Sequence, residues 1–133
     1  MSRAEELWHL FIERASADSA ALEQGLSDIR LDRLAEASAQ LDGLAYHAFQ
    51  LAESSLLLGA EEVGALALAC ERALDLITAG AVMSGLMMPT LVASALTLRQ
   101  AIDELAVTGA GDRSGAQAAS RPLEAARFEL ETF

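Results

Sequence analysis

The sequence predicts an all-α fold, an antiparallel up-down four-helix bundle with a short fifth helix that could follow it, and three observations support this. Apolar residues make up 53% of the 133 residues and aromatic residues only 5%, so Leu, Ala, Val, Ile and Met must build the core, and this set favours helices. Apolar positions recur every three or four residues along four segments. The first 106 residues lack the period-2 alternation that is typical of strands.

The first predicted helix runs from about Arg3 to Leu26 or slightly beyond. Ser2 can cap it, and Glu5 three residues later completes a capping-box pattern. The predicted inward face consists of Ala4, Leu7, Trp8, Phe11, Ala15, Leu22, Leu26 and Ile29.

The second predicted helix covers roughly Leu31 to Leu58 and has the cleanest periodicity of the chain. Its stripe keeps its phase across Gly43. Gly59 is expected to end the helix in the left-handed conformation. The stripe comprises Leu34, Ala37, Leu41, Leu44, Ala48, Leu51, Ser55 and Leu58.

Two further helices are predicted after this turn. The third spans about Glu61 to Thr78, a loop follows at 80–88, and Pro89 suits the first turn of a fourth helix that ends near Ala106. The inward residues of the third are Val63, Leu66, Ala67, Cys70, Ala73, Leu74 and Ile77. Those of the fourth are Leu91, Ala95, Leu98, Ile102 and Leu105.

The predicted organisation is one domain with a tail. Residues 1–106 form the bundle, 107–121 are rich in Gly, Ala and Ser and are expected to be a flexible linker, and 122–133 form a short helix or tail. Because the connections are short, consecutive helices are expected to lie antiparallel.

The charge of the chain excludes several classes of partner. The net charge is −11, so neither nucleic acid nor an anionic membrane surface is an expected partner. Residues 76–98 are uncharged and long enough to span a bilayer, but Gly80, Gly85 and Pro89 interrupt them, so no span is expected. A single cysteine, Cys70, forms no internal disulfide and suits the reducing cytoplasm.

No motif for catalysis or metal binding is present in the sequence. Two separate histidines and one cysteine lack metal-ligand spacing, and no Ser-His-Asp, nucleotide-loop or paired-carboxylate pattern occurs. We therefore expect no enzyme activity, no cofactor and no metal.

One stretch resembles a known family. The segment LGAEEVGALALACE, from Leu58 to Glu71, resembles the part of the histidine-phosphotransfer motif in which a glycine ends one helix and a Leu-x-x-Leu-Ala-x-x-Leu-Glu helix follows. ELWHLFIERA, from Glu6 to Ala15, is similar to the first helix of the phosphotransfer domains that open chemotaxis-type histidine kinases. The resemblance covers about residues 5–106 and implies two-component phosphorelay signalling, with a response-regulator receiver domain or a histidine kinase as partner.

The acceptor half of the motif departs from the family. The family's phosphorylated histidine lies ten residues before the glycine, which is the position of Phe49 here, and Ala52 and Glu53 replace the family's Lys and Gly. Phenylalanine cannot accept a phosphoryl group, and no Lys or Arg lies between Arg33 and Arg72 to stabilise the charge of a phosphoryl group. We therefore expect a degenerate phosphotransfer domain that binds its partner without carrying phosphate.

His47 is the alternative acceptor. It lies two residues before Phe49, about 200° around the helix at about 100° per residue. A two-residue shift in register would make His47 the phosphorylated residue, with Gln50 at the Lys position, but it would also move Asp42 and Gly43 into core positions. An active phosphotransfer protein phosphorylated on His47 remains the alternative.

The partner-binding surface is expected outside the core stripe of the second helix. Grouped apolar side chains on a helix surface often mark an interaction site. The fifth helix, through Leu123, Phe128 and Leu130, could instead cover this surface, or the chain could form a homodimer through it. An unrelated helical interaction module with another helix order is the remaining alternative. The expected surface comprises Tyr46, Phe49, Gln50, Glu53, Leu56 and Leu57.

Overall fold

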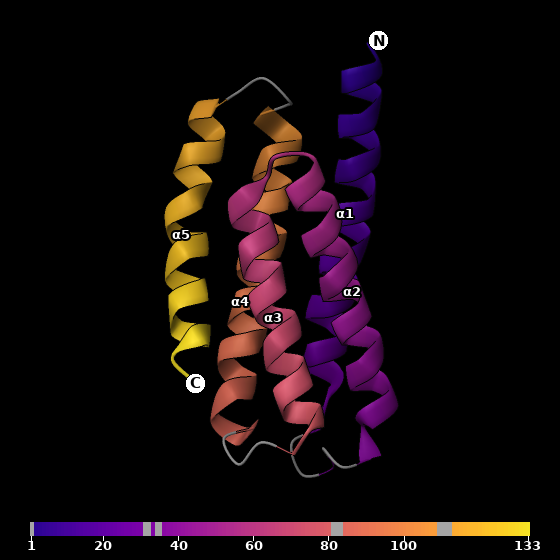
Figure 1. The fold of residues 1–133 in the computed structure, drawn as a ribbon, viewed down its shortest axis with the longest axis vertical. Helices are drawn as coiled ribbons and strands as arrows, with labels where there is room; N and C mark the ends of the chain where they lie inside the picture. Colours follow the sequence, from indigo (N-terminus) through magenta and orange to yellow (C-terminus); the bar gives the residue numbers. More distant parts are fainter. Residues whose placement is uncertain (1, 31–32, 34–35, 81–83, 109–112) are drawn as a thin grey trace.

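The structure is a computed structural model that describes every residue except 1, 31–32, 34–35, 81–83 and 109–112. The described part contains five helices and no strand, and consecutive helices run antiparallel (Figure 1), so the predicted fold class is confirmed. The helices are α1 (Arg3–Asp28), α2 (Ser38–Leu57), α3 (Glu61–Thr78), α4 (Ser84–Thr108) and α5 (Arg113–Glu131). Among the described residues, no helix has both the length and the apolarity that crossing a membrane requires.

The core follows the predicted stripes closely. Every inward residue predicted for α3 and α4 is buried, and Cys70 lies among them with no exposed surface. Burial raises the pKa of the Cys70 thiol to about 12, so this side chain behaves as a small apolar residue at neutral pH. α3 ends at Thr78 as predicted, and Gly59 has a φ of +80°, the left-handed conformation expected after α2.

The first helix begins as the capping pattern predicts. The backbone N–H of Glu5 donates to Oγ of Ser2 over 3.2 Å. Phe11, Leu22 and Leu26 are buried, but Ala4 and Leu7 are exposed, so the predicted inward positions of these two residues are wrong. Trp8 packs on the core edge beside Phe11 in place of Leu7, with 5.4 Å between the ring centroids.

The second helix starts later than predicted. It begins at Ser38 rather than Leu31, because the chain leaves α1 in an extended conformation at Ile29 and a backbone bond from Arg33 to Arg30 closes a turn. The predicted inward position of Leu34 lies outside the described residues. From Ala37 onward the stripe is buried as predicted, and Leu58 packs against the core while partly buried.

The fourth helix starts earlier than predicted. It begins at Ser84, so Pro89 lies inside the helix instead of in its first turn. A proline near the start of a helix removes only one backbone hydrogen bond. The helical conformation before Pro89 allows Met87 and Met88 to be buried in the core. The predicted loop at 80–88 is therefore too long, and its residues 81–83 lie outside the described part.

The fifth helix is also longer than predicted. It begins at Arg113 rather than Pro122, so the expected flexible linker is wrong from Arg113 onward, and residues 109–112 of it lie outside the described part. Alanine is abundant in this stretch, and although it also occurs in linkers it has a high helix propensity. Leu123 and Leu130 are buried where α5 packs against α4 and α3. That residues 1–106 form a domain by themselves stays a prediction.

Candidate functional site

The outer face of α2 exposes a group of large apolar side chains. Tyr46, Phe49, Leu56 and Leu57 have 60%, 45%, 50% and 78% of their surface exposed. α2 packs against α1 on one side and α3 on the other, with its core stripe facing inward. These four residues therefore lie outside the core stripe, where the sequence predicts them.

The buried residues of α2 are those expected when the motif is aligned on Gly59. Leu41, Leu44, Ala48, Leu51 and Ser55 are buried. Asp42 and Gly43 are exposed, whereas the two-residue shift that would make His47 the motif acceptor places them in the core. That shifted register is wrong. Phe49 keeps the position that, by the resemblance, belongs to the phosphorylated histidine.

The flank of α2 that faces α3 is apolar and closely packed. A Cβ placed on Gly64 of α3 would lie 2.8 Å from Cγ of Leu56 and 3.3 Å from the carbonyl oxygen of Ala52. The glycine thus allows α3 to approach α2 closely. Phe49 lies two helical turns before Leu56 and so on the same flank.

The flank of α2 that faces α1 is polar. Nδ1 of His47 lies 2.9 Å from Oδ1 of Asp18, and the two side chains are 38% and 13% exposed. An ionised carboxylate can only accept a hydrogen bond, so Nδ1 must carry the proton. His47 is therefore tied to α1 and does not lie on the open outer face of α2.

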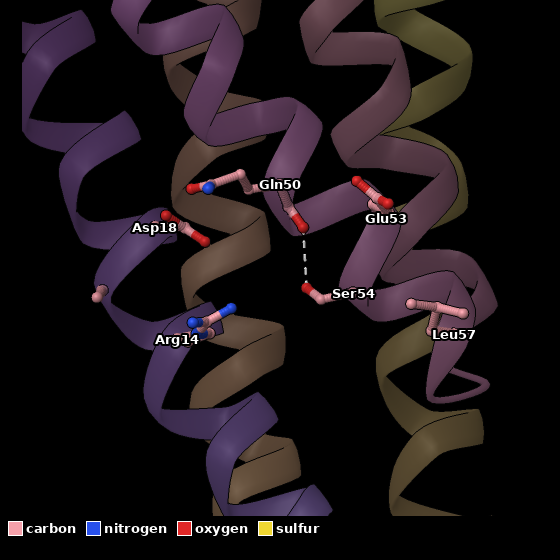
Figure 2. Close-up of a pocket in the computed structure, with 7 residues that line it drawn as sticks. Arg14, Asp18, Gln50, Glu53, Ser54 and Leu57 are labelled. Carbon is pink, nitrogen blue, oxygen red and sulfur yellow. Dashed lines mark hydrogen bonds between the residues drawn. The ribbon is translucent and has the colours of Figure 1, made fainter.

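A groove of about 480 Å³ runs beside this pair between α1 and α2. Figure 2 shows Arg14 and Asp18 of α1 directed toward α2 and Gln50 directed back toward α1. Gln50 donates to the hydroxyl of Tyr46 over 2.9 Å, and Ser54 donates to the backbone carbonyl of Gln50 over 2.9 Å. The groove is lined by Arg14, Ala17, Asp18, Gln50, Glu53, Ser54 and Leu57.

The contribution of α1 to this surface is not evident from the sequence around Phe49. Arg14 is distant from Phe49 in the sequence and is brought beside α2 by the antiparallel packing of α1. Leu7 and Leu10 are exposed and lie on the same side of α1 as Arg14, by spacings of seven and four residues. The i, i+3, i+7 spacing of Leu7, Leu10 and Arg14 is the signal that could have indicated a second exposed face on α1.

The alternative in which the fifth helix covers the surface is wrong. α5 packs against α3 and α4 and leaves the four exposed side chains of α2 uncovered. Of the three residues proposed for that cover, Leu123 and Leu130 are buried against α3 and α4, and Phe128 is itself exposed.

The described residues include no group of three or more His, Cys, Asp or Glu side chains that could hold a metal ion. Two carboxylates of α3, those of Glu62 and Glu71, each have a buried Oε2 atom without a hydrogen-bond partner among the described residues. Burial and the neighbouring Asp75 carboxylate raise the pKa of Glu71, and Arg72 opposes this shift. Glu71 lies two turns after Gly64, so it belongs to the seam between α2 and α3.

Comparison with solved structures shows which fold this is. The chain is similar to the phosphorylated P1 domain of CheA3 from R. sphaeroides, crystallised in complex with CheY6, with a TM-score of 0.66 and 23% sequence identity over 95% of this chain and 98% of that chain. No protein-family model and no curated protein matches the chain. The chain therefore has the fold of a histidine-phosphotransfer domain, and the alternative of a bundle with another helix order is wrong.

Proposed function

We propose that this chain is a degenerate phosphotransfer domain of two-component signalling, which binds the receiver domain of a response regulator, or a histidine kinase, without carrying phosphate. The observation that carries the proposal is Phe49. The ring is half exposed on the outer face of α2, at the position that the resemblance gives to the phosphorylated histidine. A phenyl ring has no lone pair that could attack phosphorus, but it is a good anchor for a protein interface.

Two observations support a receiver as the partner. The P1 domain with the same fold was crystallised in complex with CheY6. Four large apolar side chains are exposed on the outer face of α2, and grouped apolar side chains on the surface of a small protein favour protein interaction. We infer a cytoplasmic setting from the same signalling role.

A binding screen tests this proposal. The full chain is measured by biolayer interferometry against every receiver domain and histidine-kinase core encoded in the source genome. We expect binding to at least one of them, and Phe49→Asp should weaken it about 30-fold or more, because it places a charge in the centre of an apolar contact.

Phe128→Asp is the matched control for this screen, since Phe128 is exposed on α5 and α5 does not pack against α2. It should leave the affinity unchanged. If no receiver or kinase binds, or if the chain with Phe49→Asp binds as well as the unchanged protein, the proposal is wrong.

A second candidate function is an active phosphorelay through His47, favoured by the contact between His47 and Asp18. The carboxylate holds the proton on Nδ1, which leaves the lone pair on Nε2. That lone pair could attack the phosphorus of an acyl phosphate while the P–O bond breaks and its electron pair leaves on the carboxylate.

Phosphoramidate, a small phosphoryl donor, tests the second candidate without a partner. Mass spectrometry at neutral pH should find no added phosphate on the chain if the first proposal holds. An acid-labile addition that is lost in the His47→Ala protein would establish the second candidate instead.

A further inference from the structure

The groove between α1 and α2 carries three charged side chains, Arg14, Asp18 and Glu53, and two of them are exposed. Arg14 comes from α1 and Glu53 from α2, and both are exposed (Figure 2). The other polar side chains of the groove have partners within the chain: Asp18 contacts His47, Gln50 donates to Tyr46, and Ser54 donates to a backbone carbonyl. The polar lining is thus satisfied apart from one cation and one anion.

Neither charge forms an ion pair or a side-chain hydrogen bond among the described residues. Elsewhere the same bundle does pair its charges across helices, since Arg99 of α4 contacts Glu23 of α1 at 2.8 Å. Arg14 shares its groove with two carboxylates, Asp18 and Glu53, and pairs with neither within 4.0 Å. The groove therefore presents two opposite charges that are available to another molecule.

The apolar side chains around the groove would strengthen the interaction of these charges with a bound partner. Leu57 lines the groove itself and is largely exposed, and Leu10 lies one turn from Arg14 on the same side of α1. A partner that covers such leucines removes water from the charges beside them. Opposite charges then attract more strongly than at an open surface, and like charges repel more strongly.

We propose that Arg14 and Glu53 determine which receiver domain binds, by pairing with a carboxylate and with a basic side chain of that receiver. This inference rests on the proposed function, because the receiver is the occupant, and it adds the charge pattern that the receiver must carry. A correct partner is selected by opposite charges in a defined order. A receiver with the reverse order meets like charges at both positions.

Charge reversal tests the proposal on the full chain, with the receiver found in the screen as the probe. Arg14→Glu and Glu53→Arg should each weaken binding about 10-fold or more at low salt, and the difference from the unchanged protein should shrink as the salt concentration rises. Arg14→Lys should keep most of the affinity, because it retains the positive charge.

Arg121→Glu and Glu129→Arg are the matched reversals on α5, where both residues are exposed. They make the same changes in net charge and should leave the affinity unchanged within about twofold. Circular dichroism confirms that each variant is folded.

The outcomes separate the two proposals. If Arg14→Glu and Glu53→Arg bind as well as the unchanged protein while Phe49→Asp binds weakly, the groove does not select the partner and the proposed function stands. If the α5 reversals weaken binding as much as the groove reversals, only net charge matters and the inference is wrong. If a histidine kinase binds but no receiver does, the inference is wrong and the proposed function stands. If neither a receiver nor a kinase binds, both proposals are wrong.

Discussion

The two flanks of α2 differ in chemistry although they belong to one helix. The flank toward α3 is apolar, with Leu56 packed over Gly64 and Phe49 two turns away. The flank toward α1 is polar, with His47 bound to Asp18 and a groove beside the pair. The helical period assigns two residues that are only two positions apart to opposite flanks.

This difference separates His47 from the position that the resemblance gives to the phosphorylated histidine. Its imidazole is held in the seam with α1, and its Nδ1 is occupied by Asp18. Phe49 lies on the other flank, which is open to a partner. A histidine close in sequence to the motif position is therefore not equivalent to a histidine at that position.

The largest expected change in stability comes from a side chain placed at the close contact between α1 and α2. A Cβ on Gly25 would collide with Cδ2 of Leu44, which is buried and cannot move into solvent. Gly25→Ala should lower the free energy of unfolding by about 1–3 kcal/mol, measured by urea denaturation. A neutral or stabilising result would show that the seam with α1 is looser than its glycine indicates.

Gly64→Ala makes the matched change in α3, at its contact with the other flank of α2. Its Cβ would meet Leu56, which is half exposed and can turn outward. We expect a smaller loss than for Gly25→Ala, in the same urea experiment. An equal or larger loss would contradict the contrast between a fixed seam with α1 and an adaptable seam with α3.

The contact between His47 and Asp18 should contribute about 1 kcal/mol to stability, because one partner is largely shielded from water. A double-mutant cycle with His47→Ala and Asp18→Ala measures this coupling directly. A coupling near zero would mean that the pair does not hold α2 to α1, and it would leave His47 free to serve another role.

Gly43 offers a stabilising change. Nothing lies within 4 Å of a Cβ placed there, and the residue is exposed inside α2. Gly43→Ala should raise the free energy of unfolding by about 0.5–1 kcal/mol, because alanine loses less backbone entropy in a helix. Thermal denaturation at pH 7 measures the gain, and a loss of stability would indicate that α2 needs the glycine for bending.

The smallest effect concerns Glu71 in the seam between α2 and α3. Its pKa is raised in the folded protein, mainly by burial, so the folded state binds the proton more tightly than the unfolded chain. The resulting stability is complete below the unfolded pKa and is lost as the pH rises through the raised pKa. Glu71→Gln should therefore raise the Tm by about 1–2 °C at pH 7 and leave it nearly unchanged near pH 4. An equal gain at both pH values would exclude ionisation as the cause.

Much of the fold could be predicted from the sequence, because the apolar stripes of α3 and α4 have a single period and end at clear signals such as Gly59. The errors lie at the ends of helices. Pro89 and the Ala-rich stretch before Pro122 indicate boundaries in the sequence, whereas both helices begin earlier. In α4 the residues before Pro89 contribute Met87 and Met88 to the core. Local propensity decides such boundaries only where no core contact competes with it.

The candidate site could be predicted only in part. The exposed face of α2 followed from the phase of one helix, so Tyr46, Phe49 and Leu57 were found. Arg14 and Asp18 could not be assigned to the same groove, since that required knowing which side of α1 packs against α2. Contacts between helices depend on their rotation about their axes, and a single sequence constrains this weakly.

The most direct test is a map of the bound receiver on the chain by NMR chemical-shift changes. The account predicts the largest changes at the outer face of α2, at Tyr46, Phe49, Leu56 and Leu57, with smaller changes at Arg14 and none on α5. A footprint centred on the exposed faces of α4 and α5, with the signals of Phe49 and its neighbours unmoved, would contradict it.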